Sequence, residues 1–345
     1  MRTVRIFGDG IAGLSAARML TALGQRVTVT GAGPIGARCV VLNAASSFLL
    51  ERIWDRDLVQ RAALHALEQR IVTWEGITPA CVEDRGIITD VAALCRLMRS
   101  ILDRDPMVEW DDANREFDIV AAKLDDGGFY LSGGERHAVQ ASAWLVDGAY
   151  AHSMLVEAVP TGWLVGLPIG NSEATLMGVG RRKSVCLDTL LEASTLCRAA
   201  VRDVGPTSEP TGAAPRLFVA SRTNQSVKRI GDVGMRLDPL CGDGIGSSLR
   251  SAHLAALLNC RARDATDFHA NMLYEQRLAQ AMRAHLRGLA RLYQAAPLER
   301  NWAIELDAME AMDRELCRLW PAETLPIAVM EDSLLINAPM QGCPD

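Results

Sequence analysis

Three glycines near the start of the chain have the spacing of a phosphate-binding loop. Gly8, Gly10 and Gly13 stand between a short apolar run and a segment whose apolar residues recur at helical spacing. In such a G-x-G-x-x-G pattern the first glycine permits a tight turn, the second lets a pyrophosphate approach the backbone, and the third lets helix and strand pack closely. The unpaired N–H groups that open the helix attract the phosphates. The pattern predicts a dinucleotide site that includes Ile11 and Ala12.

A second glycine-rich segment lies about two-thirds of the way along the chain. It reads "GDVGMRLDPLCGDGIG", from Gly231 to Gly246, and it leads directly into the helical pattern "SSLRSAHLAALLN". A carboxylate at the end of a strand, beside a glycine-rich helix start, is typical of a polar-ligand site in an open α/β sheet. NAD needs one phosphate loop, whereas FAD also carries a ribityl chain and an isoalloxazine ring that extend far from it. The pair of segments therefore indicates FAD.

The first loop lacks one usual companion. The predicted second strand, residues 26–30, is expected to end in Asp or Glu, because a carboxylate there holds the hydroxyls of the adenosine ribose. The strand instead ends in Val29-Thr30-Gly31. Two alternatives remain open: Thr30 offers its hydroxyl to the ribose, or the ribose is held from elsewhere. Either would make the affinity for a dinucleotide modest.

Composition and charge exclude several classes of function. The 345 residues carry a net charge of −6 and no basic run, which argues against a nucleic-acid partner. None of the nine cysteines forms a C-x-x-C pair, so reduced thiols fit better than a disulfide framework or a metal site. No apolar stretch is long enough to span a bilayer, and Met1 leads directly into a strand. We therefore expect a cytoplasmic protein with no metal and no membrane contact.

The late glycine segment resembles the G-D…P-x-x-G-x-G segment of FAD-dependent monooxygenases with the fold of para-hydroxybenzoate hydroxylase. The resemblance implies that Asp232 binds the ribityl hydroxyls and that Pro239 lies along the flavin edge. It also implies that the helix start brings N–H groups to the pyrimidine carbonyl, where the helix dipole favours the charge of reduced flavin. Cys241, beside the flavin edge, either tunes the ring or fills space. The residues of this helix start are Gly242, Gly244, Ile245 and Gly246.

Two intermediate stretches fit the same family. Arg85, in "EDRGIITDVAALCRLM", resembles an arginine that precedes a helix and contacts the flavin phosphate or the ribityl region, although a solvated arginine explains it equally well. Residues 117–149 are typical of a β-meander with glycine turns. Asp147, followed by Gly148, resembles the D-G element that ends this region in the family.

Two further stretches indicate the branch of tryptophan halogenases and their monooxygenase relatives. "RCVVLNAASSFLLERIW" looks like their G-E-x-L-P-P segment, which implies that Arg38 contacts FAD and that Asn43 to Ser47 lie under the ring. "GWLVGLPIGNSEATLMGVG" predicts two adjacent strands, and Trp163 matches the first residue of the halogenase W-x-W-x-I-P, with Val165 in place of the second tryptophan. We expect Trp163, Asn43 and Cys241 to face the substrate or flavin. The alternative for Trp163 is a place in the core.

Lysine usage argues against halogenation. Halogenases carry a lysine that receives hypohalous acid, after the segment that resembles residues 38–54. This chain has only Lys123, Lys183 and Lys228, and none lies between residues 39 and 122. The resemblance therefore implies a monooxygenase that uses O2 through a flavin C4a-hydroperoxide, with NADH, NADPH or a separate reductase as electron source. That chemistry needs a dry pocket more than it needs reactive side chains.

The predicted architecture is α/β. A Rossmann-like FAD-binding domain with the β-meander would comprise residues 1–150 and 215–262, a small mixed-sheet substrate domain 151–214, and a C-terminal helical region 263–345. So small a substrate domain favours a bulky or protein-bound aromatic substrate over a free small molecule. Relatives of the halogenases mature tryptophylquinone cofactors by oxidising a tryptophan of a partner protein. Two rival hypotheses are a flavin-fold assembly partner that binds FAD weakly, and a flavin oxidase or reductase that passes electrons to a partner.

Overall fold

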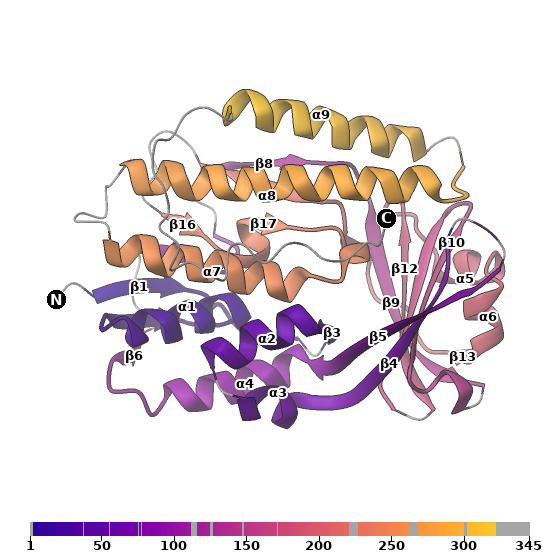
Figure 1. Cartoon of the computed structure of the whole chain (residues 1–345), viewed down its shortest axis with the longest axis horizontal. Helices are drawn as coiled ribbons and strands as arrows, with labels where there is room; N and C mark the ends of the chain where they lie inside the picture. Colours follow the sequence, from indigo (N-terminus) through magenta and orange to yellow (C-terminus); the bar gives the residue numbers. More distant parts are fainter. Residues whose placement is uncertain are drawn as a thin grey trace.

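Two large sheets and a layer of long helices make up the computed structural model (Figure 1). The structure describes residues 3–36, 38–54, 56–74, 76, 78–111, 116–124, 127–146, 148–170, 172–220, 227–261, 268–299 and 302–321. No helix in these ranges is both long and apolar enough to cross a membrane. The eight cysteines that fall within them are all free thiols.

A five-stranded parallel sheet carries the first glycine loop. Its order is β16-β7-β1-β2-β6, and every neighbouring pair is parallel. Parallel strands covered on both faces read as continuous apolar runs, which explains why β2 is buried along nearly its whole length. The strands are β1 (Thr3–Phe7), β2 (Arg26–Thr30), β6 (Val108–Trp110), β7 (Ile119–Val120) and β16 (Lys228–Arg229).

Helices cover this parallel sheet. Helix α1 (Ile11–Ala22) follows β1 directly, and it packs side by side with α7 (Gly244–Arg261) and against α4 (Val91–Leu102) (Figure 1). Asp90 caps α4 by accepting from the backbone N–H of Ala93 at 2.8 Å. The arrangement is the Rossmann-like unit that the sequence predicts. Short helices α2 (Ala44–Ile53) and α3 (Arg56–Ala62) pack beside it.

A nine-stranded mixed sheet forms the other half of the molecule, in the order β13-β9-β12-β11-β10-β4-β5-β3, with β14 paired to β9. Helices α5 (Leu187–Glu192) and α6 (Leu196–Ala200) pack on its outer side (Figure 1). The strands are β3 (Cys39–Asn43), β4 (Ala63–Thr73), β5 (Ala80–Asp90), β9 (His137–Leu145), β10 (Ser153–Val159), β11 (Gly162–Pro168), β12 (Glu173–Gly180), β13 (Val201–Val204) and β14 (Thr211–Gly212).

The mixed sheet confirms one strand prediction and draws on more of the chain than expected. β11 and β12 are the two adjacent strands predicted from "GWLVGLPIGNSEATLMGVG", and they pair antiparallel in an unbroken register. β3, β4 and β5 come from residues 39–90, so the strands of this sheet lie on both sides of the predicted domain boundary at residue 150. The domain limits themselves stay a prediction.

The expected β-meander over residues 117–149 is wrong. β7 joins the parallel sheet, β9 joins the mixed sheet, and β8 (Phe129–Ser132) lies in a three-stranded sheet with β15 (Arg216–Val219) and β17 (Met235–Arg236). The glycine turns between them do not close hairpins. Gly134 has φ +126°, a conformation that redirects the chain from one sheet to the next.

Two long helices close the structure. α8 (Phe268–Ala295) packs on α7, and α9 (Ala303–Leu319) packs on α8 and on β8 (Figure 1). Apolar side chains of α9 and of its N-cap residue are buried where these elements meet. They are Trp302, Met309, Met312 and Leu316. The C-terminal helices that the sequence predicts are therefore present among the described residues, and the apolar face of α9 is used for packing.

Candidate functional site

The first glycine loop has the backbone geometry of a phosphate-binding loop. Gly8 has φ +105°, and a Cβ on Gly13 would come within 1.8 Å of the carbonyl oxygen of Gly8. Among the described residues, nothing lies within 4 Å of a Cβ placed on Gly10, which is the N-cap of α1 and provides no side-chain cap. This opening at the N-terminus of α1 is where a pyrophosphate would approach in a loop of this type.

The second glycine segment lies against the first. Gly231 has φ +63°, and a Cβ on it would approach the Cβ of Ala12 to 2.9 Å. Its N–H donates to Oγ of Ser251 at 3.0 Å, so the turn is fixed to α7. Asp232 follows in the short 3-10 helix η2 (Gly231–Val233), and its side chain is exposed. A carboxylate thus stands next to the N-terminal turn of α1.

The start of α2 contacts the far end of the second segment. Nδ2 of Asn43 donates to the carbonyl oxygen of Gly242 at 3.5 Å, and the hydroxyl of Ser46 donates to Oδ1 of Asp243 at 3.4 Å. Gly246 has no room for a side chain, because its Cβ would lie 2.1 Å from Oδ1 of Asp243. The sequence predicts that the start of α2 and the second glycine segment both lie beside the flavin ring. In the fold these two regions are in contact with each other.

Gly242 and Gly244 leave the approach to α7 clear. No atom lies within 4 Å of a Cβ on either glycine, and Gly242 has φ +61°. The segment enters through the 3-10 helix η3 (Pro239–Cys241), which Asp238 caps by accepting from the N–H of Leu240 at 3.0 Å. The two glycine segments lie in contact, and each leads into the N-terminus of a helix.

A cleft of about 820 Å³ lies near the start of α2. It opens beside Asn43, between the start of α2 and the long β4–β5 hairpin. Glu83 and Arg85 lie on its wall and form an ion pair at 3.0 Å. Many of its lining side chains are exposed, so the cleft is open to solvent. The lining residues are Leu42, Ser47, Ala66, Leu67, Glu68, Gln69, Cys81, Glu83, Arg85, Gly86 and Ile87.

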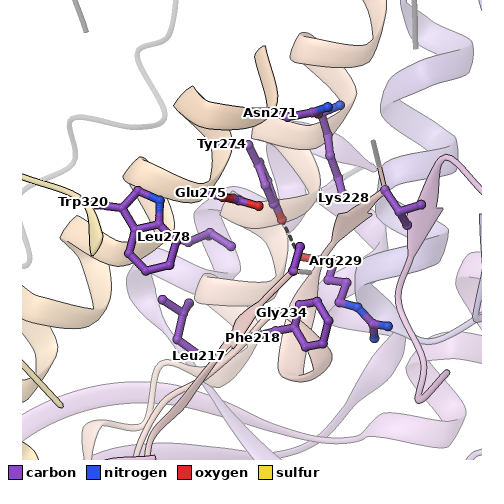
Figure 2. A pocket seen from close by; sticks show the side chains of 12 residues that line it. Leu217, Phe218, Lys228, Arg229, Gly234, Asn271, Tyr274, Glu275, Leu278 and Trp320 are labelled. Carbon is purple, nitrogen blue, oxygen red and sulfur yellow. Dashed lines mark hydrogen bonds between the residues drawn. The ribbon is translucent and has the colours of Figure 1, made fainter. Parts of the chain in front are cut away.

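A second cavity, between α8 and strands β15 and β16, is much smaller (Figure 2). Its volume is about 20 Å³, which suits a single water rather than a substrate. Tyr274 and Asn271 of α8 line it, and the hydroxyl of Tyr274 donates to the carbonyl oxygen of Arg229 at 2.6 Å. We assign this cavity to packing and not to catalysis.

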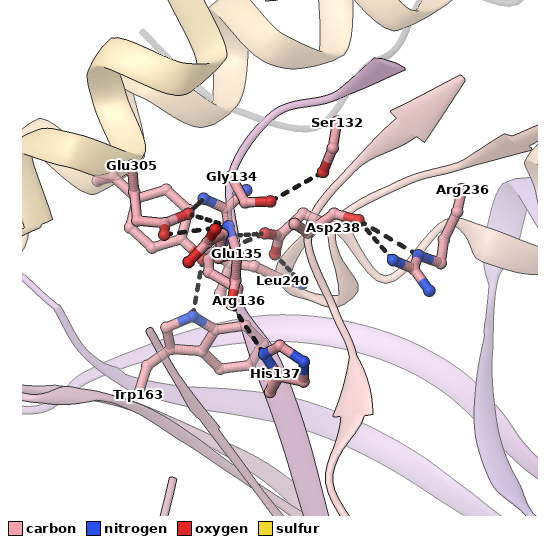
Figure 3. A network of polar contacts seen from close by, with 12 residues as sticks. Ser132, Gly134, Glu135, Arg136, His137, Trp163, Arg236, Asp238, Leu240 and Glu305 are labelled. Atoms are coloured by element: carbon pink, nitrogen blue, oxygen red, sulfur yellow. Dashed lines mark hydrogen bonds and ion pairs between the residues drawn. The ribbon is translucent and has the colours of Figure 1, made fainter. Parts of the chain in front are cut away.

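A buried polar network lies behind the second glycine segment (Figure 3). Nε of Arg136 donates to Oδ2 of Asp238 at 2.9 Å, and Nη1 donates to Oε2 of Glu305 at 2.6 Å. The hydroxyl of Tyr293 donates to Asp238 at 3.2 Å. His285 accepts from the backbone N–H of Asp238 at 3.0 Å. The network connects η3 with α8, α9 and the segment before β9.

Burial sets the charge states in this network. Desolvation raises the pKa of Glu305, although Arg136 opposes the shift. Desolvation lowers the pKa of His285, which suits a neutral imidazole that accepts a hydrogen bond. Desolvation alone would lower the pKa of Arg136, but Tyr293, Asp238 and Glu305 raise it above its usual value. The guanidinium therefore stays charged next to Asp238.

Trp163 belongs to this network and not to the cleft. Its side chain is fully buried, and Nε1 donates to the hydroxyl of Tyr293 at 2.8 Å. The expected substrate-facing tryptophan is therefore a core residue, as the alternative interpretation held. The reason is tertiary, because Trp163 on β11 points toward α8, which the sequence pattern of β11 cannot show.

Three other predicted residues lie in unexpected surroundings. Arg85 lies within β5, in the strand that leads directly into α4, and its side chain is 84% exposed in the cleft. The buried hydroxyl of Thr30 donates to the carbonyl oxygen of Asp111 at 2.6 Å, so its proton is already committed. Desolvation raises the pKa of Cys241 to about 12, which keeps the thiol neutral and suits a space-filling role.

Arg38 and Asp147 complete the predicted set. The side chain of Arg38 is exposed, and its backbone N–H donates to Oδ1 of Asp90 at 2.9 Å, which places it at the start of α4. Asp147 lies outside the described residues. The roles of all these residues toward a cofactor stay predictions.

The sequence interpretation missed two groups of residues. The buried network of Arg136, Asp238 and Glu305 leaves no local pattern, because its members are far apart in the chain. The other is Asp9, a charged residue inside the glycine loop, whose carboxylate pairs with Arg99 at 3.1 Å. Its only sequence signal is a carboxylate between two loop glycines.

Comparison with known proteins places the fold. No protein-family model and no curated protein sequence matches the chain. Among solved structures, a peptidyl tryptophan dihydroxylase, QhpG, essential for tryptophylquinone cofactor biogenesis, superposes with a TM-score of 0.71 at 19% identity, over 88% of this chain and 78% of that one. The flavin-dependent halogenase CmlS gives 0.67 at 15% identity, over 91% and 70%.

A third structure, a single-residue variant of HpxO from Klebsiella pneumoniae complexed with FAD, gives a TM-score of 0.62 at 16% identity, over 92% of this chain and 95% of that one. Identities this low establish the architecture and leave the reaction open. The chain has the α/β fold of the FAD-dependent monooxygenases of the para-hydroxybenzoate hydroxylase type.

Proposed function

We propose that this protein is a FAD-dependent monooxygenase that hydroxylates an aromatic substrate. The observation that carries the proposal is the contact between the two glycine segments, in which Gly231 lies against Ala12. This contact forms one surface from two helix N-termini and an exposed carboxylate. When bound, FAD would supply the redox chemistry that activates O2.

The residues of the chain would bind and orient that cofactor. The first turn of α1, from Ile11 to Gly13, would hold the pyrophosphate with its unpaired N–H groups. Asp232 would accept hydrogen bonds from the ribityl hydroxyls. The first turn of α7, from Gly244 to Gly246, would direct N–H groups and the positive end of a helix dipole to the pyrimidine edge of the ring.

We further propose that the substrate is a tryptophan side chain of a protein or peptide. The cleft beside Asn43 is large and open, with exposed walls from β4 and β5, and an open cleft admits a side chain that is attached to a polypeptide. The fold similarity to an enzyme described as a peptidyl tryptophan dihydroxylase supports the same substrate class. A free aromatic small molecule is the alternative that the experiment must separate.

Lysine placement supports oxygenation over halogenation. Among the described residues that line the cleft, none is a lysine. Lys228 is buried in β16, and Lys123 and Lys183 are exposed elsewhere. A group that accepts hypohalous acid next to the cleft would therefore have to be of another type.

The first test is a visible absorbance titration of the purified protein with FAD, followed by NADH, NADPH or a reductase in air. We expect a saturable change in the flavin spectrum, bleaching and recovery, and a mass increase of a tryptophan-containing polypeptide. Asp232→Ala should weaken FAD binding while the protein stays folded, and Asp188→Ala, on the exposed surface of α5, serves as the matched control.

Each alternative outcome identifies a rival function. An unperturbed flavin spectrum would favour the assembly partner that binds FAD weakly. Peroxide without hydroxylated product would favour the oxidase or reductase. Incorporation of halide in place of oxygen would favour a halogenase.

A further inference from the structure

The carboxylate of Asp9 lies at the end of β2, although Asp9 belongs to the glycine loop. Its Oδ1 accepts from the backbone N–H of Ala32 at 3.3 Å. A Cβ placed on Gly31 would be 3.5 Å from Oδ2 of Asp9. The space into which a side chain at position 31 would extend is therefore filled by a carboxylate from the loop.

Position 31 is where this type of nucleotide-binding unit needs a carboxylate. It is the first residue after β2, and an acidic residue there normally holds the hydroxyls of the adenosine ribose. The hydroxyl of Thr30 is not placed to replace that acceptor, because it is buried and directed at the backbone carbonyl of Asp111, to which it donates. The chain therefore has no acidic residue at position 31, but the carboxylate of Asp9 occupies the space that the side chain of such a residue would fill.

We propose that Asp9 takes over the role of the strand-end carboxylate and binds the adenosine ribose of FAD, an inference that rests on the proposed function. Within the described part of the chain, each oxygen of Asp9 accepts one hydrogen bond, and a carboxylate has about four acceptor sites. Its side chain is 13% exposed, which leaves one side open. Acceptor capacity therefore remains for two ribose hydroxyls.

Arg99 makes this placement tolerable beside a pyrophosphate. A bare carboxylate in a phosphate-binding loop would repel the ligand. Nη1 of Arg99 donates to Oδ2 of Asp9 at 3.1 Å, and the guanidinium lies 4.1 Å from the ring centroid of Trp110. Arg99 is a positioning residue: it neutralises the charge of Asp9 and fixes its orientation.

The test compares the affinity of the variants for FAD and for FMN, which lacks the adenosine half. Losing hydrogen bonds to a charged group costs about 1.5–3 kcal/mol, so Asp9→Ala should weaken FAD binding by roughly 10- to 150-fold. Affinity for FMN should not change. Asp188→Ala, far from the loop, should leave both affinities unchanged.

A relocation variant makes the test sharper. Gly31→Glu in the Asp9→Ala background returns a carboxylate to the strand end, and it should recover most of the affinity for FAD. Gly31→Glu alone should weaken binding, because the new side chain meets Asp9. A FAD analogue with 2′-deoxyadenosine or 3′-deoxyadenosine should bind less tightly than FAD to the wild type, and Asp9→Ala should abolish this difference for at least one of them.

The outcomes separate this inference from the proposed function. Wild-type protein that binds FAD, with equal affinity in Asp9→Ala, would overturn the role of Asp9 alone. Equal losses for FAD and FMN would overturn it too, because Asp9 would then only brace the loop. Wild-type protein that binds neither flavin would overturn the proposed function and this inference together.

Discussion

Nε of Arg136 lies 2.9 Å from Oδ2 of Asp238, and both side chains are completely inaccessible to solvent. Asp238 also caps η3, the turn that begins at Pro239 within the second glycine segment. The pair therefore joins that segment to the start of β9. Removing Asp238 leaves the buried guanidinium of Arg136 with one carboxylate partner, that of Glu305, in place of two.

We predict that Asp238→Ala destabilises the protein by about 3–5 kcal/mol, measured by urea unfolding. Arg136→Met combined with Asp238→Leu and Glu305→Gln should be less destabilised than Asp238→Ala, because no buried charge of this network is then left without its partner. Glu315→Ala, which breaks an exposed pair with Arg318, is the control and should leave the free energy of unfolding nearly unchanged. Equal effects of the buried and exposed changes would refute the assignment.

We predict that the indole of Trp163 contributes to the stability of the protein rather than to catalysis. Trp163→Phe removes the hydrogen bond to Tyr293 and leaves its buried hydroxyl with one partner fewer, at a cost of about 1–3 kcal/mol. Affinity for FAD should be retained, since the indole is buried in the core and reaches the second glycine segment only indirectly, through the hydroxyl of Tyr293. A large loss of hydroxylation with unchanged stability would instead restore Trp163 to a catalytic role.

Gly13 and Gly10 should respond differently to the same substitution. Gly13→Ala places Cβ against the carbonyl oxygen of Gly8, and the resulting strain should cost about 3 kcal/mol or more in unfolding experiments. Gly10→Ala meets no protein atom, so the protein should stay as stable as the wild type. FAD titration of Gly10→Ala should nevertheless show weaker binding, because the new methyl group stands where the pyrophosphate approaches. Unchanged affinity would mean that the ligand does not pass this glycine.

Glu157 should make the mixed-sheet half of the protein acid-sensitive. Burial alone would raise its pKa, but the hydroxyl of Ser194 and the backbone N–H groups of Cys197, Thr195 and Leu196 lower it below the usual value. A carboxyl whose pKa is depressed on folding contributes stability above its unfolded pKa of about 4.3. That contribution is lost as pH falls through the lower folded pKa.

The measurement is unfolding free energy against pH for the wild type and Glu157→Gln. The variant should be less stable at neutral pH by about 1–3 kcal/mol, and the difference should shrink as the solution becomes more acidic than about pH 4. A difference that is independent of pH would show that the carboxylate is not ionised in the folded protein.

Local features of this fold follow from the sequence, and long-range ones do not. The turn at Gly8 and the close approach at Gly13 depend on a few neighbouring residues, and the glycine spacing predicts both. The helix that ends near Trp320 and the pairing of β11 with β12 are equally local. Each is confirmed because its pattern and its partner lie in one short stretch.

The predictions that fail concern residues whose structural partners are distant in the sequence. β8 pairs with β15 and not with its neighbour in sequence, so turn glycines alone suggest a meander that does not form. Arg85 lies in a strand whose outer half is exposed on both faces, which removes the alternation that identifies strands. The proposed role of Asp9 depends on its position beside Gly31, 22 residues further along the chain. The spacing of residues in the sequence does not show that the carboxylate of Asp9 lies where the strand-end Asp or Glu is absent.

The contact of Gly231 with Ala12 also affects when the site can form. β16 pairs with β7, and α7 packs on α1. The two glycine segments therefore come into contact only when chain segments from both ends of the first 261 residues have been made. During synthesis, the N-terminal loop emerges long before its counterpart, and contacts of such high sequence separation form slowly. A nascent chain therefore carries only the first glycine segment for most of its translation, and a cofactor that needs both segments would bind only after the second has been made.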